Sequence, residues 1–155
     1  MTRHVLLSLM AASPIVPPPA EPSPMDALRE SFLATSAWIV EAARRVPAER
    51  FDFRPAASVR TLGQLIGHVV DGNAYYCGRA AGKSPDWVET VAESGAAKDE
   101  LIRQLEASTA ECGKTYHQSN APRIAELVAN LGHVNLHYGN LVTYLRILGL
   151  TPPSS

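Results

Sequence analysis

The chain has 155 residues, 46% of them hydrophobic, and carries 14 basic and 15 acidic side chains for a net charge of −1. This length is enough for one domain with a hydrophobic core, and the scattered Lys and Arg residues exclude a basic surface for nucleic acid. No apolar run approaches the roughly 20 residues of a membrane-spanning helix. Neither a glycine-rich phosphate-binding loop nor a GxSxG motif is present.

The first 23 residues are expected to be a leader that precedes the folded domain, which is assigned to residues 24–155. A short apolar run, VLLSLMAA, is followed by the proline-rich stretch PIVPPPAEPSP. This order resembles a weak secretory signal followed by a tether, although cleavage after Ser13 would leave Pro14 as the first residue. Translation starting at Met25 is the alternative. If the leader is a signal peptide, the protein is exported or periplasmic. If translation starts at Met25, the protein is expected to be cytoplasmic.

Apolar residues recur at helical spacing in four segments, which predicts helices at about 24–46, 62–81, 98–116 and 122–148. Ser23, Thr61 and Asn120 are expected to cap the first, second and fourth helices. Pro122 suits the first turn of the fourth helix, and a glycine at position 149 suits its C-terminal end. These four amphipathic helices predict an all-α fold.

The predicted architecture is a four-helix bundle of the antiparallel type, and its two longer connections leave room for one crossover. Phe51 and Phe53 alternate as in a strand, but prolines bracket them, so they are expected to be loop residues that plug one end of the core. Cys77 and Cys112 fall on apolar helix faces, which favours buried thiols over a bridge or metal ligands. A homodimer is compatible with such a bundle, but no discrete feature indicates one.

His133 and His137 are the first candidates for a functional site. Residues four apart stack on one face of a helix, about 6 Å apart along its axis, so both imidazoles can reach one metal ion. The pair lacks the glutamate of an HExxH zinc protease motif. His68 is the best candidate for a third ligand. All three histidines fall at the shoulder of an apolar stripe, although incidental histidines at this spacing remain the alternative.

Two blocks, FDFRPAASVRTLGQLIGHVVDGNAYYC and HVNLHYGNLVTYLRILGLTPPSS, resemble the damage-inducible DinB-like family of metal-binding four-helix bundles. The resemblance covers about residues 25–154. In that family one histidine of the second helix and an HxxxH pair of the last helix bind a metal, so the resemblance implies that His68, His133 and His137 are the ligands. Zinc is the expected divalent ion, with nickel, iron or manganese as alternatives.

The resemblance also implies a metal-dependent enzyme acting on a small-molecule substrate, either a hydrolase or a transferase that uses a low-molecular-weight thiol. Asp71, three residues after His68, could orient that histidine, act as a base or face solvent. Asn130 and Asn140 could hydrogen-bond a water or an imidazole, but they are expected to face solvent. Tyr75 and Tyr144 could line a pocket, but they are expected to serve in packing. The alternatives are a non-catalytic stress or envelope protein with a structural metal, and a helical interaction module whose histidines are incidental.

Overall fold

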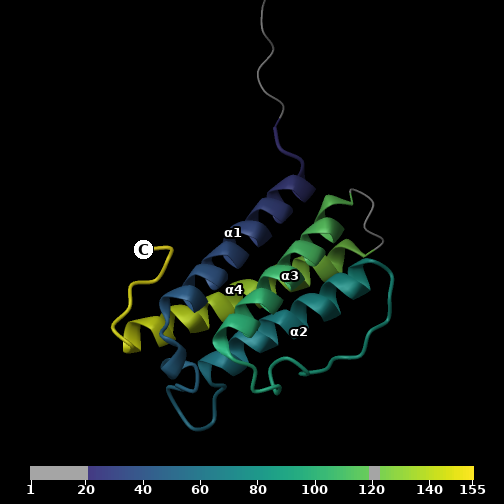
Figure 1. The fold of residues 1–155 in the computed structure, drawn as a ribbon. Helices are drawn as coiled ribbons and strands as arrows, with labels where there is room; N and C mark the ends of the chain where they lie inside the picture. The colour runs from purple at the N-terminus through teal and green to yellow at the C-terminus, as the bar shows by residue number, and fades with distance from the viewer. Residues whose placement is uncertain (1–20, 119–122) are drawn as a thin grey trace, which may run out of the picture.

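The computed structural model describes residues 21–118 and 123–155. It contains four helices in this part of the chain, and no strand occurs there (Figure 1). The bounds are α1 Pro24–Arg45, α2 Leu62–Ala80, α3 Lys98–His117 and α4 Ile124–Ile147, with a short 3-10 helix, η1, at Ala48–Arg50. The all-α four-helix bundle predicted from the sequence is therefore confirmed. None of the described helices is both long and apolar enough to cross a membrane.

Local chemistry accounts for three of the helix ends. The side chain of Ser23 accepts a hydrogen bond from the Asp26 backbone, and that of Thr61 accepts one from Gln64, each as part of a capping box. At the C-terminal end of α4, Gly149 adopts a φ of 75°, which stops this helix at little steric cost. The predicted N-cap and first-turn proline of α4 lie outside the described residues.

The order of helices around the bundle differs from the order along the chain. α1 and α2 each pack mainly against α3 and α4. α2 runs parallel to α3, because Gly63 faces Leu101 near their starts while Cys77 meets Cys112 further along. α2 runs antiparallel to α4, with Arg79 paired to Glu126. The connection at 81–97 is therefore the crossover that the sequence left room for, and it runs back along the bundle (Figure 1).

The core is contributed by all four helices and by the segment that follows α1. Its largest fully buried side chains include Phe32, Ile39, Leu65, Leu105 and Leu145. Phe51 is buried at one end, and its carbonyl accepts a hydrogen bond of 2.8 Å from the Gly63 backbone. The expected loop plug is thus present, and it fixes the start of α2.

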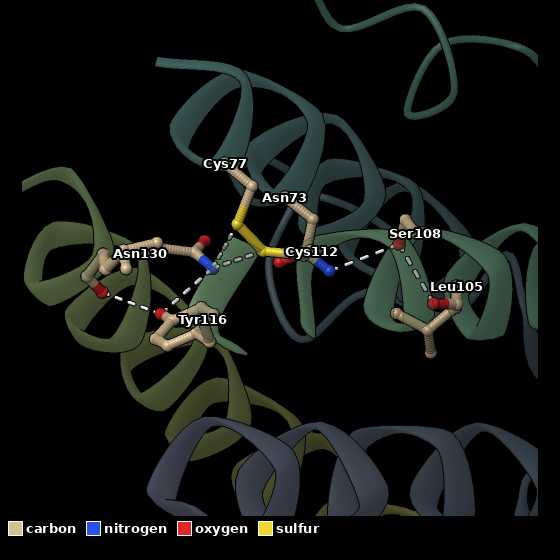
Figure 2. Close-up of a disulfide and its surroundings, with 8 residues drawn as sticks. Asn73, Cys77, Leu105, Ser108, Cys112, Tyr116 and Asn130 are labelled. Carbon is tan, nitrogen blue, oxygen red and sulfur yellow. Dashed lines mark hydrogen bonds between the residues drawn. A yellow bond between two sulfur atoms is a disulfide. The ribbon is translucent and has the colours of Figure 1, made fainter. Parts of the chain in front are cut away.

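A disulfide joins Cys77 to Cys112, which corrects the prediction of two free buried thiols (Figure 2). Both cysteines are buried as expected, but the parallel packing of α2 and α3 places their Cα atoms 5.3 Å apart. Asn130 is fully buried beside the bridge and donates to the Cys112 sulfur at 3.2 Å, so the prediction that it faces solvent is wrong. Sequence periodicity does not reveal the relative register of two helices, and so it could not reveal this bridge.

Candidate metal centre

Three histidines from two antiparallel helices meet between α2 and α4. One potential ligand nitrogen from each of His68, His133 and His137 lies within 4.8 Å of the others. The Nε2 atoms of His68 and His133 are 3.2 Å apart. His68 and His137 are buried, and His133 is partly buried. The structure therefore brings together all three residues that the sequence singled out.

Gly72 on α2 makes room for the His133 ring. A Cβ atom at this position would lie 2.2 Å from the Cε1 atom of His133 and 2.7 Å from its Nδ1 atom. Real Cβ atoms do not approach other atoms so closely, so only glycine permits this ring to pack directly against the α2 backbone. No local sequence pattern distinguishes Gly72 from other helical glycines, because its importance depends on a contact between distant segments.

Burial keeps the three imidazoles neutral. It lowers the pKa of His133 to about 3, and the neighbouring His137 and His68 add to the effect. It also lowers the pKa of His137 to about 4, with further contributions from His68 and Arg60. Burial is again the main cause of the lowered pKa of His68, followed by the charge of Arg60. Neutral imidazole is the form that binds a metal ion.

The geometry and chemistry of the triad fit one divalent ion. Two nitrogen ligands about 2.0–2.1 Å from a tetrahedral zinc ion stand roughly 3.3 Å apart, close to the separation of the His68 and His133 Nε2 atoms. The Nδ1 atom of His133 is buried and has no hydrogen-bond partner among the described residues. Three neutral nitrogen donors without a carboxylate suit zinc, and they also accept nickel or iron.

Glu89 and Arg60 support the triad, and sequence reasoning missed both. Glu89 lies in the connection between α2 and α3, and its Oε1 atom is 3.1 Å from the Nδ1 atom of His68, although the two groups are not aligned as a hydrogen bond. The same carboxylate pairs with the Arg60 guanidinium at 2.6 Å. The negative charge of a carboxylate beside the outer nitrogen of a histidine favours the tautomer that keeps the proton on that nitrogen. The unusual length of this connection was the signal that could have drawn attention to Glu89.

Trp87 covers the triad from the same connection. Its ring centroid lies 5.3 Å from that of His68 and 5.8 Å from that of His133, in edge-on contacts. Tyr75 packs against Trp87 with 5.1 Å between ring centroids, in agreement with the packing role expected for it. An aromatic cover of this kind limits the access of water to one side of the site.

Asp71 and Gly67 of α2 hold this connection in place. The Asp71 carboxylate accepts hydrogen bonds from the backbone nitrogens of Val91 and Ala92 at 3.0–3.1 Å. A Cβ on Gly67 would lie 2.7 Å from backbone atoms of the same two residues, so the connection touches the helix backbone. The described contacts of Asp71 are therefore with the connection, while its suggested roles as a base or as the partner of His68 stay predictions.

The remaining candidate helpers lie around the open side. The Asn140 side-chain amide lies 3.3 Å from the Nδ1 atom of His137, although Asn140 is exposed as expected. Tyr144 is buried and donates to the carbonyl of Arg60 at 2.7 Å, so it helps to position the start of α2. A cavity of about 640 Å³ is lined by His137, Asn140, Tyr144 and Glu89. The site therefore has a covered side and an accessible side.

Comparisons with known proteins add the family to this geometry. No curated protein and no solved structure shows a significant match to the chain. The DinB superfamily matches residues 31–141, a span that includes His68, His133 and His137. This match extends over more than half of the sequence and confirms the resemblance that the two sequence blocks indicated. The chain therefore belongs to the DinB superfamily.

Proposed function

We propose that the chain is a metal-dependent enzyme of the DinB-like type, in which His68, His133 and His137 bind one divalent ion, with zinc the first choice. The observation that carries the proposal is the convergence of three neutral imidazoles beside an accessible cavity. The candidate reactions are transfer to or from a low-molecular-weight thiol and hydrolysis of a small-molecule substrate. Both require a ligand position that the protein does not fill.

A divalent ion held by three neutral ligands supplies Lewis acidity, which polarises a carbonyl group or favours the deprotonated form of a thiol or water. The protein side chains have separate tasks. Glu89 lies beside the outer nitrogen of His68 and favours the tautomer that leaves its inner nitrogen free, while the Asn140 amide lies beside the outer nitrogen of His137. The ring of Trp87 excludes water from one side of the triad.

Asp71 is proposed to be a positioning residue. Both of its carboxylate oxygens accept backbone hydrogen bonds from the connection that carries Trp87 and Glu89. Through these bonds Asp71 determines where Trp87 and Glu89 lie relative to the triad. A role as a base would require the carboxylate to release these backbone groups.

A structural metal that ties α2 to α4 is the alternative function. It is favoured by one observation: the Glu89 carboxylate lies 3.1 Å from the outer nitrogen of His68, so a shift of this side chain towards the inner nitrogens of the triad would make it a fourth ligand. A site closed in this way would stabilise the protein and leave no position for a substrate. The two functions therefore differ in whether an external ligand can reach the ion.

Cobalt substitution tests the proposal, because Co²⁺ reports its ligands by visible and near-ultraviolet absorption. We expect the Co²⁺-loaded protein to develop a thiolate-to-metal charge-transfer band when 2-mercaptoethanol is added. The Glu89→Gln variant should show the same band, with Glu93→Gln as a control from the same connection. If wild-type Co²⁺ protein binds no thiol and Glu89→Gln does, the metal is structural and the enzyme proposal is wrong.

A further inference from the structure

The cavity beside the triad has two arginines in its wall. It is bounded by the segment before α2, by Glu89 and by the C-terminal half of α4, and its volume is about 640 Å³. His137 belongs both to the triad and to the cavity lining, so a molecule in the cavity lies next to the proposed metal. Arg54 and Arg60 line the same space. The cavity is therefore a candidate for the substrate pocket.

The charges around the cavity do not cancel. Arg60 pairs with Glu89, which is the only acidic residue among the described residues that line the cavity. Arg54 makes no ion pair within the described part of the chain, and its guanidinium reaches only the Ala57 carbonyl, at 3.5 Å. With the histidines neutral, the wall carries a net charge of about +1, and a divalent ion would raise the local charge to about +3.

The two arginines differ in how firmly they are held. The guanidinium of Arg60 is held by Glu89 and its carbonyl by the Tyr144 hydroxyl, so this residue is fixed at the cavity wall. Arg54 is exposed, and most of its donors are unused within the described residues. A guanidinium offers a fork of N–H donors that matches the two oxygens of a carboxylate or phosphate. Arg54 is thus free to close on an anion that Arg60 helps to attract.

From this arrangement we propose that the substrate of the site carries an oxyanion group, a carboxylate or a phosphate, which Arg54 binds in the cavity beside His137. This inference rests on the proposed function, because it assigns a substrate class to the same site. The oxyanion is recognised by the arginine fork while the reacting part of the molecule faces the triad. Neutral molecules of the same size should bind more weakly, because they lack the negative charge that the positively charged cavity wall attracts.

Titration calorimetry at low ionic strength tests this inference on metal-free and zinc-loaded protein. Glutarate is the carboxylate probe, glycerol phosphate is the phosphate probe, and glutaramide is the neutral match for glutarate. We expect at least one anionic probe to bind and glutaramide not to bind. Arg54→Gln should weaken the binding of that probe at least tenfold, while Arg50→Gln, which changes an arginine outside the cavity lining, should leave it unchanged.

Three results would overturn the inference. They are equal affinity for glutarate and glutaramide, unchanged anion binding in Arg54→Gln, and no binding of either anion. The zinc content of Arg54→Gln is measured in parallel, because this variant should retain the metal of the wild type. If the protein retains zinc but shows no Arg54-dependent binding, the oxyanion pocket is refuted and the metal site is not. Arg54-dependent binding in a wild-type protein that takes up no zinc supports the pocket and refutes the metal site.

Discussion

At the scale of single residues, Gly72 determines whether the His133 ring can reach its position in the triad. The His133 ring packs where a side chain at position 72 would otherwise lie, because a Cβ atom there would stand only 2.2 Å from the Cε1 atom of the ring. Gly139 on α4 offers a comparison, because a Cβ there would meet no atom within 4 Å. Comparing alanine substitutions at these two helical glycines therefore distinguishes a steric requirement of the site from the general effect of glycine on helix stability.

We expect Gly72→Ala to displace the His133 ring and to weaken zinc binding roughly 10- to 100-fold, the range for changes that misorient a metal ligand. Gly139→Ala should keep the wild-type affinity and stabilise α4 by up to about 1 kcal/mol. Competition with a chelator of known affinity measures both values. Equal zinc affinity in the two variants would show that Gly72 does not position the ligand.

The histidine pKa values predict how the stability of the metal-free protein depends on pH. The folded protein lowers the pKa of His133 to about 3 and that of His137 to about 4, while unfolded histidines titrate near about 6.5. Below about pH 6.5 the unfolded state therefore binds more protons, so the free energy of unfolding should fall as the pH falls towards about 4. Urea unfolding in EDTA between about pH 7.5 and 5 measures this slope.

The window above about pH 5 isolates the histidines from the carboxylates, which titrate lower. A variant in which His133 and His137 are both replaced by Gln should show a flatter dependence in this window. A wild-type protein whose stability stays constant across the same window would contradict the burial of neutral imidazoles.

At the scale of elements, the connection between α2 and α3 completes the site. Its residues Trp87 and Glu89 lie in an irregular stretch, outside any helix. It contributes both of these residues, and Asp71 and Gly67 fasten it to α2. Its docking therefore depends on a few backbone hydrogen bonds and close contacts. Removing one of the acceptors should release the connection while the helices remain.

Trp87 is 39% exposed, and we expect Asp71→Ala to expose it further. Each hydrogen bond to a charged acceptor that the substitution removes contributes about 1.5–3 kcal/mol. In a Trp38→Phe background, acrylamide should quench Trp87 fluorescence more strongly in this variant than in its parent. Asp52→Ala removes an exposed carboxylate and serves as the control. Unchanged quenching in Asp71→Ala would show that this carboxylate does not hold the connection.

The helices and the three clustered histidines were predictable from the sequence, whereas the contacts of the connection were not. The two capping boxes, the apolar spacing and the HxxxH pair are local patterns, and the structure shows the expected helices and brings the three histidines together. The placement of Trp87, Glu89 and Asp71 depends on which helix face the connection crosses. That choice is made by tertiary packing, as is the register that brings the two cysteines together.

At the scale of the whole molecule, two cross-links would hold α2 in the bundle. The disulfide joins α2 to α3, and the proposed metal joins α2 to α4. The bridge closes a segment with a sequence separation of 35 residues, which includes the connection that covers the triad. The two cross-links therefore restrain the same helix towards different neighbours.

We expect a variant carrying both Cys77→Ser and Cys112→Ser to be less stable than the oxidised protein by about 2–4 kcal/mol, the usual effect of a disulfide on the unfolded chain. Urea unfolding of metal-free protein measures the difference. Reductant should lower the stability of the wild type and leave that of the double variant unchanged. Insensitivity of both proteins to reductant would contradict the presence of the bridge.

The central claim is that three histidines from two helices share one divalent ion, and elemental analysis of the purified protein tests it most directly. After incubation with zinc and removal of the excess, the wild type and His117→Ala, which lies outside the triad, should each retain about one zinc ion per chain. His137→Ala should retain none while its helical circular dichroism survives. Stoichiometric zinc in His137→Ala, or no bound metal in the wild type, would contradict the account.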